Sequence, residues 1–423
     1  GAPAEAGLPP PIASNVPGTW AHDTMSRRIR EEILRGQVVE PHGARLSAAA
    51  RSALGELERE LERAGASGLR HIGEDGGPDV ATWREIMEPY VGVSWLDAPW
   101  VVAEFYFYRR VLEALGYFRG GFPDPFAGQK LQGLRAAAGS VEALAAKLQD
   151  AHACAFDDPE TLVKLFIATA LWGNRMDLSI WPAASGEDGS SRDRAAQAFQ
   201  EVLGSSQRML LCDHSGAVWA RLARAREAGG RPVDIVVDNA GFELVTDLCL
   251  ADALVAAGVA SKVTFHVKGH PTFVSDAMAK DVREHIAELR EGGAKFPASA
   301  AAARRWEGLL AAGTWELRED FFWAQPTPFW DMPGDVRALL APSAMVFVKG
   351  DANYRRVLGE RAWDLGAPFE EVAGYWKEVA PVCALRTLKA ELGCGMPPEA
   401  RARAAAEDPQ WLVSGRYGVI HHA

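Results

Sequence analysis

Polar and charged side chains follow several short apolar segments of the sequence, and some of them are residue types that suit metal and phosphate chemistry. Asp238 and Asn239 follow one apolar segment directly, Asp276 lies shortly beyond the next, and Lys349 follows a later one. Carboxylate and amide oxygens are hard ligands for cations such as Mg²⁺ and Mn²⁺, and a lysine ammonium is a compact positive charge for a phosphate. These residues therefore suggest a divalent cation bound next to a phosphate group.

The apolar segments are short, and several are apolar on both faces, as strands are in a parallel sheet that helices cover on both sides. In open α/β sheets, loops and helix N-termini converge beyond the carboxyl ends of the strands, and ligands bind there. Each polar residue alone has an ordinary alternative role, because Asp and Asn cap helices and Gly forms turns. Their coincidence at successive strand ends favours one site. The segments span residues 209–212, 233–237, 263–267, 344–348 and 382–385.

The segment after Asn239 supports phosphate binding. Residues 241–257 have the spacing of a helix whose apolar side faces the sheet, and the positive N-terminal end of this helix would face the proposed ligand. Lys349 can supply a fixed positive charge to the same phosphate. Asp351 could orient a water molecule or Lys349, and a role in the turn is an equal alternative.

A scaffold must position these strand ends, and the sequence predicts that it consists of two domains. Residues 1–185 are expected to form a helical N-terminal domain, because their apolar residues keep helical spacing. Residues 186–423 alternate apolar segments with helical ones, which predicts a Rossmann-like three-layer α/β/α domain with a mostly parallel sheet. A polar Gly- and Ser-rich stretch at the junction marks the boundary. The helices of the first part are expected at residues 24–36, 48–64, 100–116, 140–151 and 159–171.

Composition narrows the classes of partner. The 423 residues include 45 Lys and Arg against 56 Asp and Glu, a net charge of −11, so a nucleic-acid partner is not expected. An anionic substrate would need a local cation to overcome this charge. The N-terminus has no leader-like pattern, no segment reaches the length of a membrane span, and the five cysteines lack zinc spacing, which together predict a cytoplasmic location with no membrane partner. His421 and His422 are expected to form a frayed tail, and the sequence leaves the oligomeric state open.

Three blocks of sequence carry a family resemblance: VDNAGFE at residues 237–243, VSD at residues 274–276 and KGDANYR at residues 349–355. Together they resemble the damage-control phosphatase family, in the branch also described as acidic-residue (protein-glutamate) methyltransferase-like. Other blocks of that branch occur in the same order, so the resemblance spans nearly the whole chain. They lie at residues 8–11, 100–110, 124–130, 171–179 and 385–389.

The resemblance implies a helical region on a Rossmann-like domain and hydrolysis of small phosphomonoesters, such as sugar phosphates or related metabolites, with a divalent cation (Mn²⁺, Mg²⁺, Co²⁺ or Ni²⁺). By this resemblance Asp238, Asn239 and Asp276 are the metal ligands, and Lys349 contacts the phosphate. It also suggests contacts to the rest of the substrate, although pairing on a helix surface is an alternative role for some of these residues. The candidate substrate contacts are Glu104, Asn174, Arg175, Asp177, Lys349 and Asp351.

Two substitutions relative to the family pattern leave the substrate open. Thr272 stands where an aromatic residue is usual, and Ala352 where a larger apolar residue is usual. Neither is a proposed ligand, but a smaller residue near the pocket changes which metabolite fits.

The expected mechanism is attack by a metal-activated water. A covalent aspartyl-phosphate route is less favoured, because the DxD motif that such enzymes carry after a strand is absent here. Two alternatives remain: an S-adenosylmethionine-dependent carboxyl methyltransferase, and a non-catalytic phosphometabolite-binding protein. The glycine-rich cofactor loop of a methyltransferase is missing. A non-catalytic binding protein would not be expected to retain the full set of Asp238, Asn239, Asp276 and Lys349.

Overall fold

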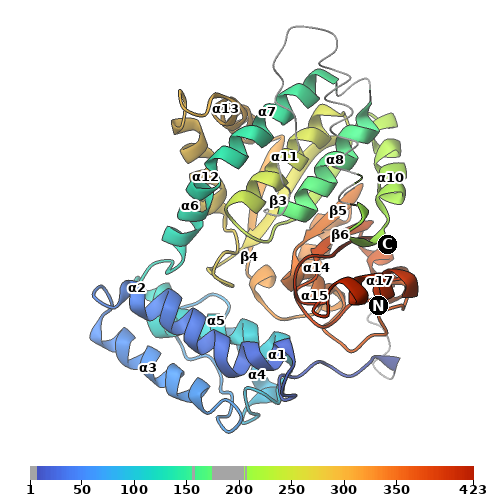
Figure 1. Cartoon of the computed structure of the whole chain (residues 1–423). Coiled ribbons are helices and arrows are strands. Elements are labelled where there is room, and N and C mark those ends of the chain that lie inside the picture. The colour runs from blue at the N-terminus through green and yellow to red at the C-terminus, as the bar shows by residue number, and fades with distance from the viewer. Residues whose placement is uncertain (1–6, 155–157, 174–203, 205–206) are drawn as a thin grey trace.

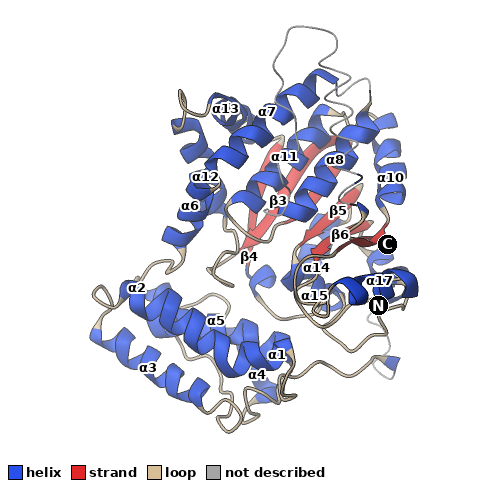
Figure 2. Ribbon diagram, in the orientation of Figure 1, coloured by secondary structure: helices blue, strands red, loops and turns tan. Residues whose placement is uncertain are grey.

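The computed structural model describes residues 7–154, 158–173, 204 and 207–423. It consists of a helical lobe (residues 20–119) and a larger body (residues 127–422) built around a sheet, as Figures 1 and 2 show. In Figure 1 the lobe is the blue layer of helices below the body. A helical N-terminal region and a mostly parallel sheet with helices on both faces confirm the fold class that the sequence predicts.

The lobe is organised around one long buried helix, α5. Nearly every side chain of α5 is buried, and α3 and η2 pack against it. The helix ends at Gly116, whose φ of 65° lies in the left-handed region that glycine adopts readily. The predicted helices of this region are confirmed. Its elements are α1 (Trp20–Asp23), the π-type helix η2 (Thr24–Val39), α2 (Glu40–His42), α3 (Ala48–Glu62), α4 (Val80–Met87), η3 (Glu88–Tyr90), α5 (Trp100–Leu115) and η4 (Tyr117–Arg119).

Three further helices of the expected N-terminal domain pack on the body: α6 (Ala127–Ala136), α7 (Ala138–Cys154) and α8 (Pro159–Trp172). α7 and α8 lie against α11, and α7 also contacts α13. Helical spacing predicts that such helices exist, but it does not identify the surface that they cover. The expected boundary between residues 185 and 186 lies outside the described residues and stays a prediction.

Within the described residues, the sheet has seven strands in the order β1-β7-β6-β5-β2-β3-β4. All neighbouring pairs are parallel except β6 and β7, which are antiparallel. The five predicted strands are confirmed, and the sequence interpretation missed β4 and β7. The strands are β1 (Leu210–Asp213), β2 (Arg231–Val236), β3 (Ala260–Lys268), β4 (Trp315–Asp320), β5 (Met345–Lys349), β6 (Val382–Thr387) and β7 (Gly418–His422).

The C-terminal residues correct one expectation. His421 and His422 do not form a frayed tail, because they belong to β7, which pairs with β1 on one side and β6 on the other. His421 is fully buried, and its Nδ1 lies 3.0 Å from the Tyr354 hydroxyl. A short strand with two histidines does not show the apolar pattern that marks a buried strand.

Helices cover both faces of the sheet, and alternate strand residues face the two sides. Val233, Ile235 and Val237 face a core with α7, α8 and α10–α13, whereas Val236 faces a core with α14–α17. The second core continues into the lobe, so one apolar interior joins both parts. No helix of the described part is long and apolar enough to cross a membrane. The covering helices are α10 (Ser215–Glu227), α11 (Phe242–Ala256), α12 (Ala279–Glu291), α13 (Pro297–Ala311), α14 (Gly334–Leu340), α15 (Asp351–Val357), α16 (Phe369–Val372) and α17 (Pro398–Glu407).

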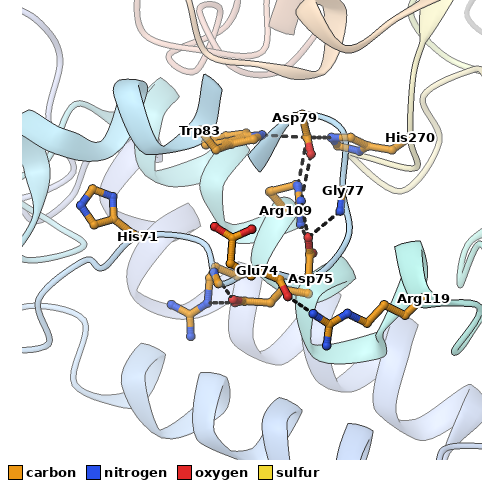
Figure 3. A network of polar contacts seen from close by, with 12 residues as sticks. His71, Glu74, Asp75, Gly77, Asp79, Trp83, Arg109, Arg119 and His270 are labelled. Atoms are coloured by element: carbon orange, nitrogen blue, oxygen red, sulfur yellow. Dashed lines mark hydrogen bonds and ion pairs between the residues drawn. The ribbon is translucent and has the colours of Figure 1, made fainter. Parts of the chain in front are cut away.

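A buried ion network ties the lobe together where it meets the body (Figure 3). The Arg109 side chain of α5 donates two hydrogen bonds to Asp75, at 2.6 and 3.0 Å, and two to Asp79, at 2.9 and 3.0 Å. Asp79 also accepts a bond from Trp83 Nε1 at 3.1 Å, and His270 Nε2 of the body lies 3.7 Å from its carboxylate. Burial opposes the charged form of Asp75, but Arg109 outweighs this effect and lowers the pKa of Asp75.

We expect Arg109→Ala to lower the free energy of unfolding by about 3–5 kcal/mol, because removing one partner of a buried pair leaves uncompensated charges. Urea denaturation measures this loss. Arg84→Ala is the control, since the Arg84–Glu74 pair has side chains 54% and 75% exposed and should contribute less than about 1 kcal/mol. A loss in Arg109→Ala no larger than in Arg84→Ala would contradict the structural role of the network.

Candidate functional site

Main-chain pairing places the predicted metal ligands side by side. After β2 the chain continues through Asp238 and Asn239, and the loop after β3 folds back so that Asn239 and Asp276 form an antiparallel bridge. The Ala277 N–H donates to the Asp238 carbonyl at 2.8 Å, and the Ala240 N–H donates to the Ser275 carbonyl at 2.7 Å. The carboxyl ends of two adjacent strands thus deliver two carboxylates to one point.

The two aspartates carry more negative charge than their surroundings neutralise. Burial raises the pKa of Asp238, and Asp276 and Glu243 raise it further. Burial also raises the pKa of Asp276, to about 6, despite the nearby Lys268. Lys268 Nζ forms an ion pair with Asp276 Oδ2 at 3.3 Å, and this single ammonium only partly offsets the two buried carboxylates. Burying charge that is incompletely compensated is costly, so the pair fits a bound cation.

Asn239 is held between acidic groups. Its Nδ2 donates to Asp238 Oδ2 and to Glu243 Oε2, both at 2.9 Å, and its Oδ1 accepts a bond from Ser275 Oγ at 2.6 Å. An amide oxygen has two lone pairs, so the bond from Ser275 leaves one for a cation. No three His, Cys, Asp or Glu side chains of the described part form a metal-binding group. Two carboxylates and one amide oxygen are instead the hard oxygen donors that suit Mg²⁺ or Mn²⁺.

Lys349 forms ion pairs with two carboxylates of α11. This buried side chain ends β5, and its Nζ lies 2.7 Å from Asp247 Oδ1 and 3.4 Å from Glu243 Oε1. Burial disfavours the charged form, but Asp247 and Glu243 outweigh it and raise the pKa of Lys349. The sequence analysis missed Glu243 and Asp247. Their spacing of four residues on the helix after Asn239 was the available signal, because it places them on one face.

Gly350 lets the end of β5 approach Asp238. Its φ is 83°, a conformation that side chains rarely adopt, and a Cβ at this position would overlap the Asp238 carboxylate. In the sequence, Gly350 was identified only as part of the KGDANYR motif. A glycine directly after a strand was the signal for a close approach of two backbones.

The N-terminus of α11 is partly used within the protein. The Gly241 N–H donates to His285 Nε2 at 2.8 Å, and burial lowers the pKa of His285 to about 4, so the imidazole is a neutral acceptor at neutral pH. The Ala240 N–H is also bonded, to Ser275. Both positive features expected to meet a phosphate, this N-terminus and the Lys349 ammonium, therefore already have partners within the protein.

A cavity of about 570 Å³ lies between the lobe and the body and brings the predicted residues together. All predicted site residues within the described part line it, whereas Asn174, Arg175 and Asp177 lie outside the described residues. Aromatic rings from both parts form much of its wall. The predicted residues in the lining are Glu104, Asp238, Asn239, Asp276, Lys349 and Asp351, and the aromatic ones are Trp20, Trp100, Tyr108, Trp172 and Phe273.

Two predicted substrate contacts are held by arginines. Glu104 Oε2 lies 2.6 Å from Arg355 Nη1, and Asp351 Oδ1 lies 2.7 Å from Arg386 Nε. Asp351 is thus oriented by Arg386, while Lys349 is paired elsewhere. Lys389 is an exposed cation in the lining and has no side-chain partner among the described residues, and the sequence analysis gave it no role.

Comparison of the chain with known proteins identifies its family. A model of the "Damage-control phosphatase ARMT1-like domain" matches residues 24–404. The chain belongs to this family. The proteins named damage-control phosphatase ARMT1 include one from Danio rerio, 34% identical over 82% of this chain and 80% of its own, and one from Homo sapiens, 31% identical over 78% and 75%. A solved DUF89 family protein from Pyrococcus horikoshii covers 88% of this chain and 96% of its own, at 16% identity and a TM-score of 0.40.

Membership of the damage-control phosphatase ARMT1-like family confirms the resemblance and the expectation of a metal-dependent phosphatase enzyme. The match extends from the lobe to α17, so it includes most of the residues that line the cavity between lobe and body. The residue roles stay predictions.

We expect Gly350→Ala to abolish binding of a divalent cation, because the new methyl group would displace the Asp238 carboxylate. Calorimetric titration with Mn²⁺ measures this loss. Gly313→Ala is the matched control, since Gly313 also has positive φ, 73°, but a Cβ there meets no atom within 4 Å. Native affinity in Gly350→Ala would show that Asp238 does not need its observed position.

The Asp247 carboxyl makes the free energy of unfolding depend on pH. Burial raises the pKa of Asp247 from 3.8 to about 7, with Lys349 opposing this shift and Glu243 adding to it. The folded protein therefore keeps a proton that the unfolded chain releases, so this group makes the free energy of unfolding fall as pH rises from about 4 to about 7. Asp247→Asn lacks this titration, and its stability relative to the native chain should rise across that window.

Urea denaturation at several pH values measures the difference between Asp247→Asn and the native chain. Asp408→Asn is the control, because hydrogen bonds, first that of Ser414, lower the pKa of exposed Asp408, and its relative stability should stay constant above about pH 4. A pH-independent difference for Asp247→Asn would refute the raised pKa.

Proposed function

We propose that the chain hydrolyses small phosphomonoesters, such as sugar phosphates or related metabolites, with a metal-activated water as nucleophile. The observation that carries this proposal is the pair of buried carboxylates, Asp238 and Asp276, beside the buried Lys349 at one end of the cavity. A cation held there supplies a more acidic water and neutralises charge on the phosphoryl group. Family membership supports the reaction class.

In this proposal Asp238, Asn239 and Asp276 hold the cation with their side-chain oxygens. Mn²⁺, Mg²⁺, Co²⁺ and Ni²⁺ all accept such oxygen donors. Lys268 Nζ is fixed by the Trp323 carbonyl at 3.0 Å and limits the repulsion at Asp276. The carboxylates then keep their charged form near neutral pH once a cation replaces the missing counter-charge.

Lys349 binds the phosphate in this proposal. Asp247 and Glu243 keep the ammonium charged and fix its position, so little reorganisation is needed when charge develops on the phosphoryl oxygens. Glu243 contacts both Lys349 and Asn239 and so couples the phosphate contact to the metal ligands. Burial strengthens these interactions relative to water.

The rest of the cavity suits a polar, hydroxylated body. Its volume lies within the usual range for small-molecule sites. Glu104 and Asp351 are fixed acceptors for hydroxyl groups, and Arg28 and Lys389 add donors to the lining of the cavity. These groups support a sugar phosphate as the substrate class.

We also propose a cytoplasmic location and no nucleic-acid partner. Cys212, Cys249, Cys383 and Cys394 are free thiols, which is usual in a reducing compartment. The net charge of −11 disfavours a polyanionic partner.

The decisive experiment measures phosphate release from sugar phosphates, nucleotides and an aryl phosphate, with chelator or with each divalent cation. We expect release only with a cation, and a loss of more than about 100-fold in Asp238→Ala, because a metal ligand should matter at least as much as the groups that orient it. Asp213→Ala is the matched control: Asp213 ends β1, is exposed, and does not line the cavity.

Release that persists in chelator, or an equal loss in Asp213→Ala, would argue against the assigned metal site. Folded protein that releases no phosphate with any cation would reject the proposal for these substrates. Methyl transfer to a carboxylate from S-adenosylmethionine, or binding of a sugar phosphate without turnover, would then be measured on the same protein.

A further inference from the structure

The loop that carries Asp276 contains a strained turn. It joins β3 to α12, and its residues Phe273 and Val274 have φ angles of 48° and 65°. Positive φ is uncommon outside glycine, and a β-branched valine is especially disfavoured there. Two consecutive residues in this conformation persist only where surrounding contacts hold them. Asp276 follows two residues after Val274, so the turn sets the direction in which its carboxylate leaves the loop.

The contact that covers this turn comes from the helical lobe. The Phe273 ring lies 4.7 Å from the ring of Phe105 and 4.7 Å from that of Tyr108, and both belong to α5. We call these three rings the aromatic clamp. Phe105 and Tyr108 are buried and Phe273 is half-buried, so the rings lie where the lobe meets the body. Such aromatic pairs contribute beyond the area that they bury.

The beginning of the same loop also meets the lobe. His270 Nε2 lies 3.7 Å from Asp79, which Arg109 of α5 holds (Figure 3). Burial lowers the pKa of His270 to about 4, so the ring is neutral at neutral pH and this contact is one of position rather than of charge. The His270 ring also lies 6.2 Å from the Phe118 ring of the lobe.

The same helix reaches the other half of the site. Glu104 precedes Phe105 on α5, and its carboxylate pairs with Arg355 Nη1 at 2.6 Å. Arg355 lies on α15, the helix that follows Lys349 and Gly350, and its guanidinium lies 3.8 Å from the Trp100 ring centroid of α5. The lobe helix α5 therefore contacts both the loop after β3, which carries Asp276, and α15, the helix after β5, which ends in Lys349.

We propose that α5 positions the metal ligand Asp276 by holding the strained turn through the aromatic clamp. The lobe then contributes to cation binding without supplying a ligand, and Phe273 is a positioning residue. Without the clamp the turn can relax toward negative φ, and the Asp276 carboxylate shifts relative to Asp238 although the main-chain bonds of Ala240 and Ala277 remain. This inference rests on the proposed metal site and adds an element that the sequence motifs do not show.

The test measures the binding of Mn²⁺ without substrate, because Phe273 and Tyr108 also line the cavity and could touch a substrate. Calorimetric titration of the whole chain compares native protein with Phe273→Ala, Phe273→Tyr and Phe296→Ala. Phe296→Ala is the matched control, since Phe296 is also half-buried but lies at the start of α13, away from the cavity lining. Thermal unfolding of each variant reports general destabilisation.

We expect Phe273→Ala to weaken Mn²⁺ binding about tenfold or more, the usual effect of losing a group that orients a ligand. Phe273→Tyr keeps the ring and should bind as the native chain does, and Phe296→Ala should lower the melting temperature without changing the affinity. Phe105→Leu retains most of the side-chain volume but removes one ring, so it should weaken binding as well. Combined with Phe273→Ala it should add no further loss, because Phe273→Ala already removes the contact between Phe273 and Phe105.

Native affinity in Phe273→Ala, or an equal loss in Phe296→Ala, overturns the clamp while leaving the phosphatase proposal intact. If Phe273→Ala does not fold, Phe105→Leu decides, and native affinity in that variant overturns the clamp. Native protein that binds no Mn²⁺ and releases no phosphate overturns both proposals together.

Discussion

Buried negative charge at the carboxyl ends of β2 and β3 is the constraint on which the rest of the site depends. Asp238 and Asp276 are removed from water, and this burial raises the pKa of each by more than the nearby lysines lower it. Desolvating charges in this way is unfavourable unless a counter-ion compensates. Lys268 and Lys349 supply part of the compensation, and a divalent cation would supply the remainder. The same cation would let a protein with a net charge of −11 accept an anionic substrate.

The lobe and the body form one functional unit. Their apolar interior is continuous, and the ion pair between Glu104 and Arg355 crosses the interface. The cavity is bounded by both parts, so its shape depends on how α5 sits against α15 and the loop that carries Asp276. Such a site separates two tasks. The strand ends provide charge, and the lobe provides part of the cavity wall.

The sequence predicted the elements that have a local signature. The strands that lead to Asp238 and Lys349 are mostly apolar, and both residues line the cavity. β4 was missed because its sequence, WELRED, lacks that pattern, as suits an edge strand. β7 was missed because its two histidines were interpreted as part of a frayed C-terminal tail. The contacts between Gly350 and Asp238 and between Phe273 and Tyr108 join segments that are distant in the chain, and no local pattern encodes them.

The position of β7 also has a consequence for how the chain folds. β1 joins the sheet only through β7, which comes much later in the sequence and lies between β1 and β6. Closing so long a loop is slow, because its entropic cost precedes any gain from pairing. During synthesis, β6 therefore keeps one open edge until β7 has left the ribosome. An unpaired edge is a route to aggregation, so the synthesis of the residues between β6 and β7 is a period of exposure to it.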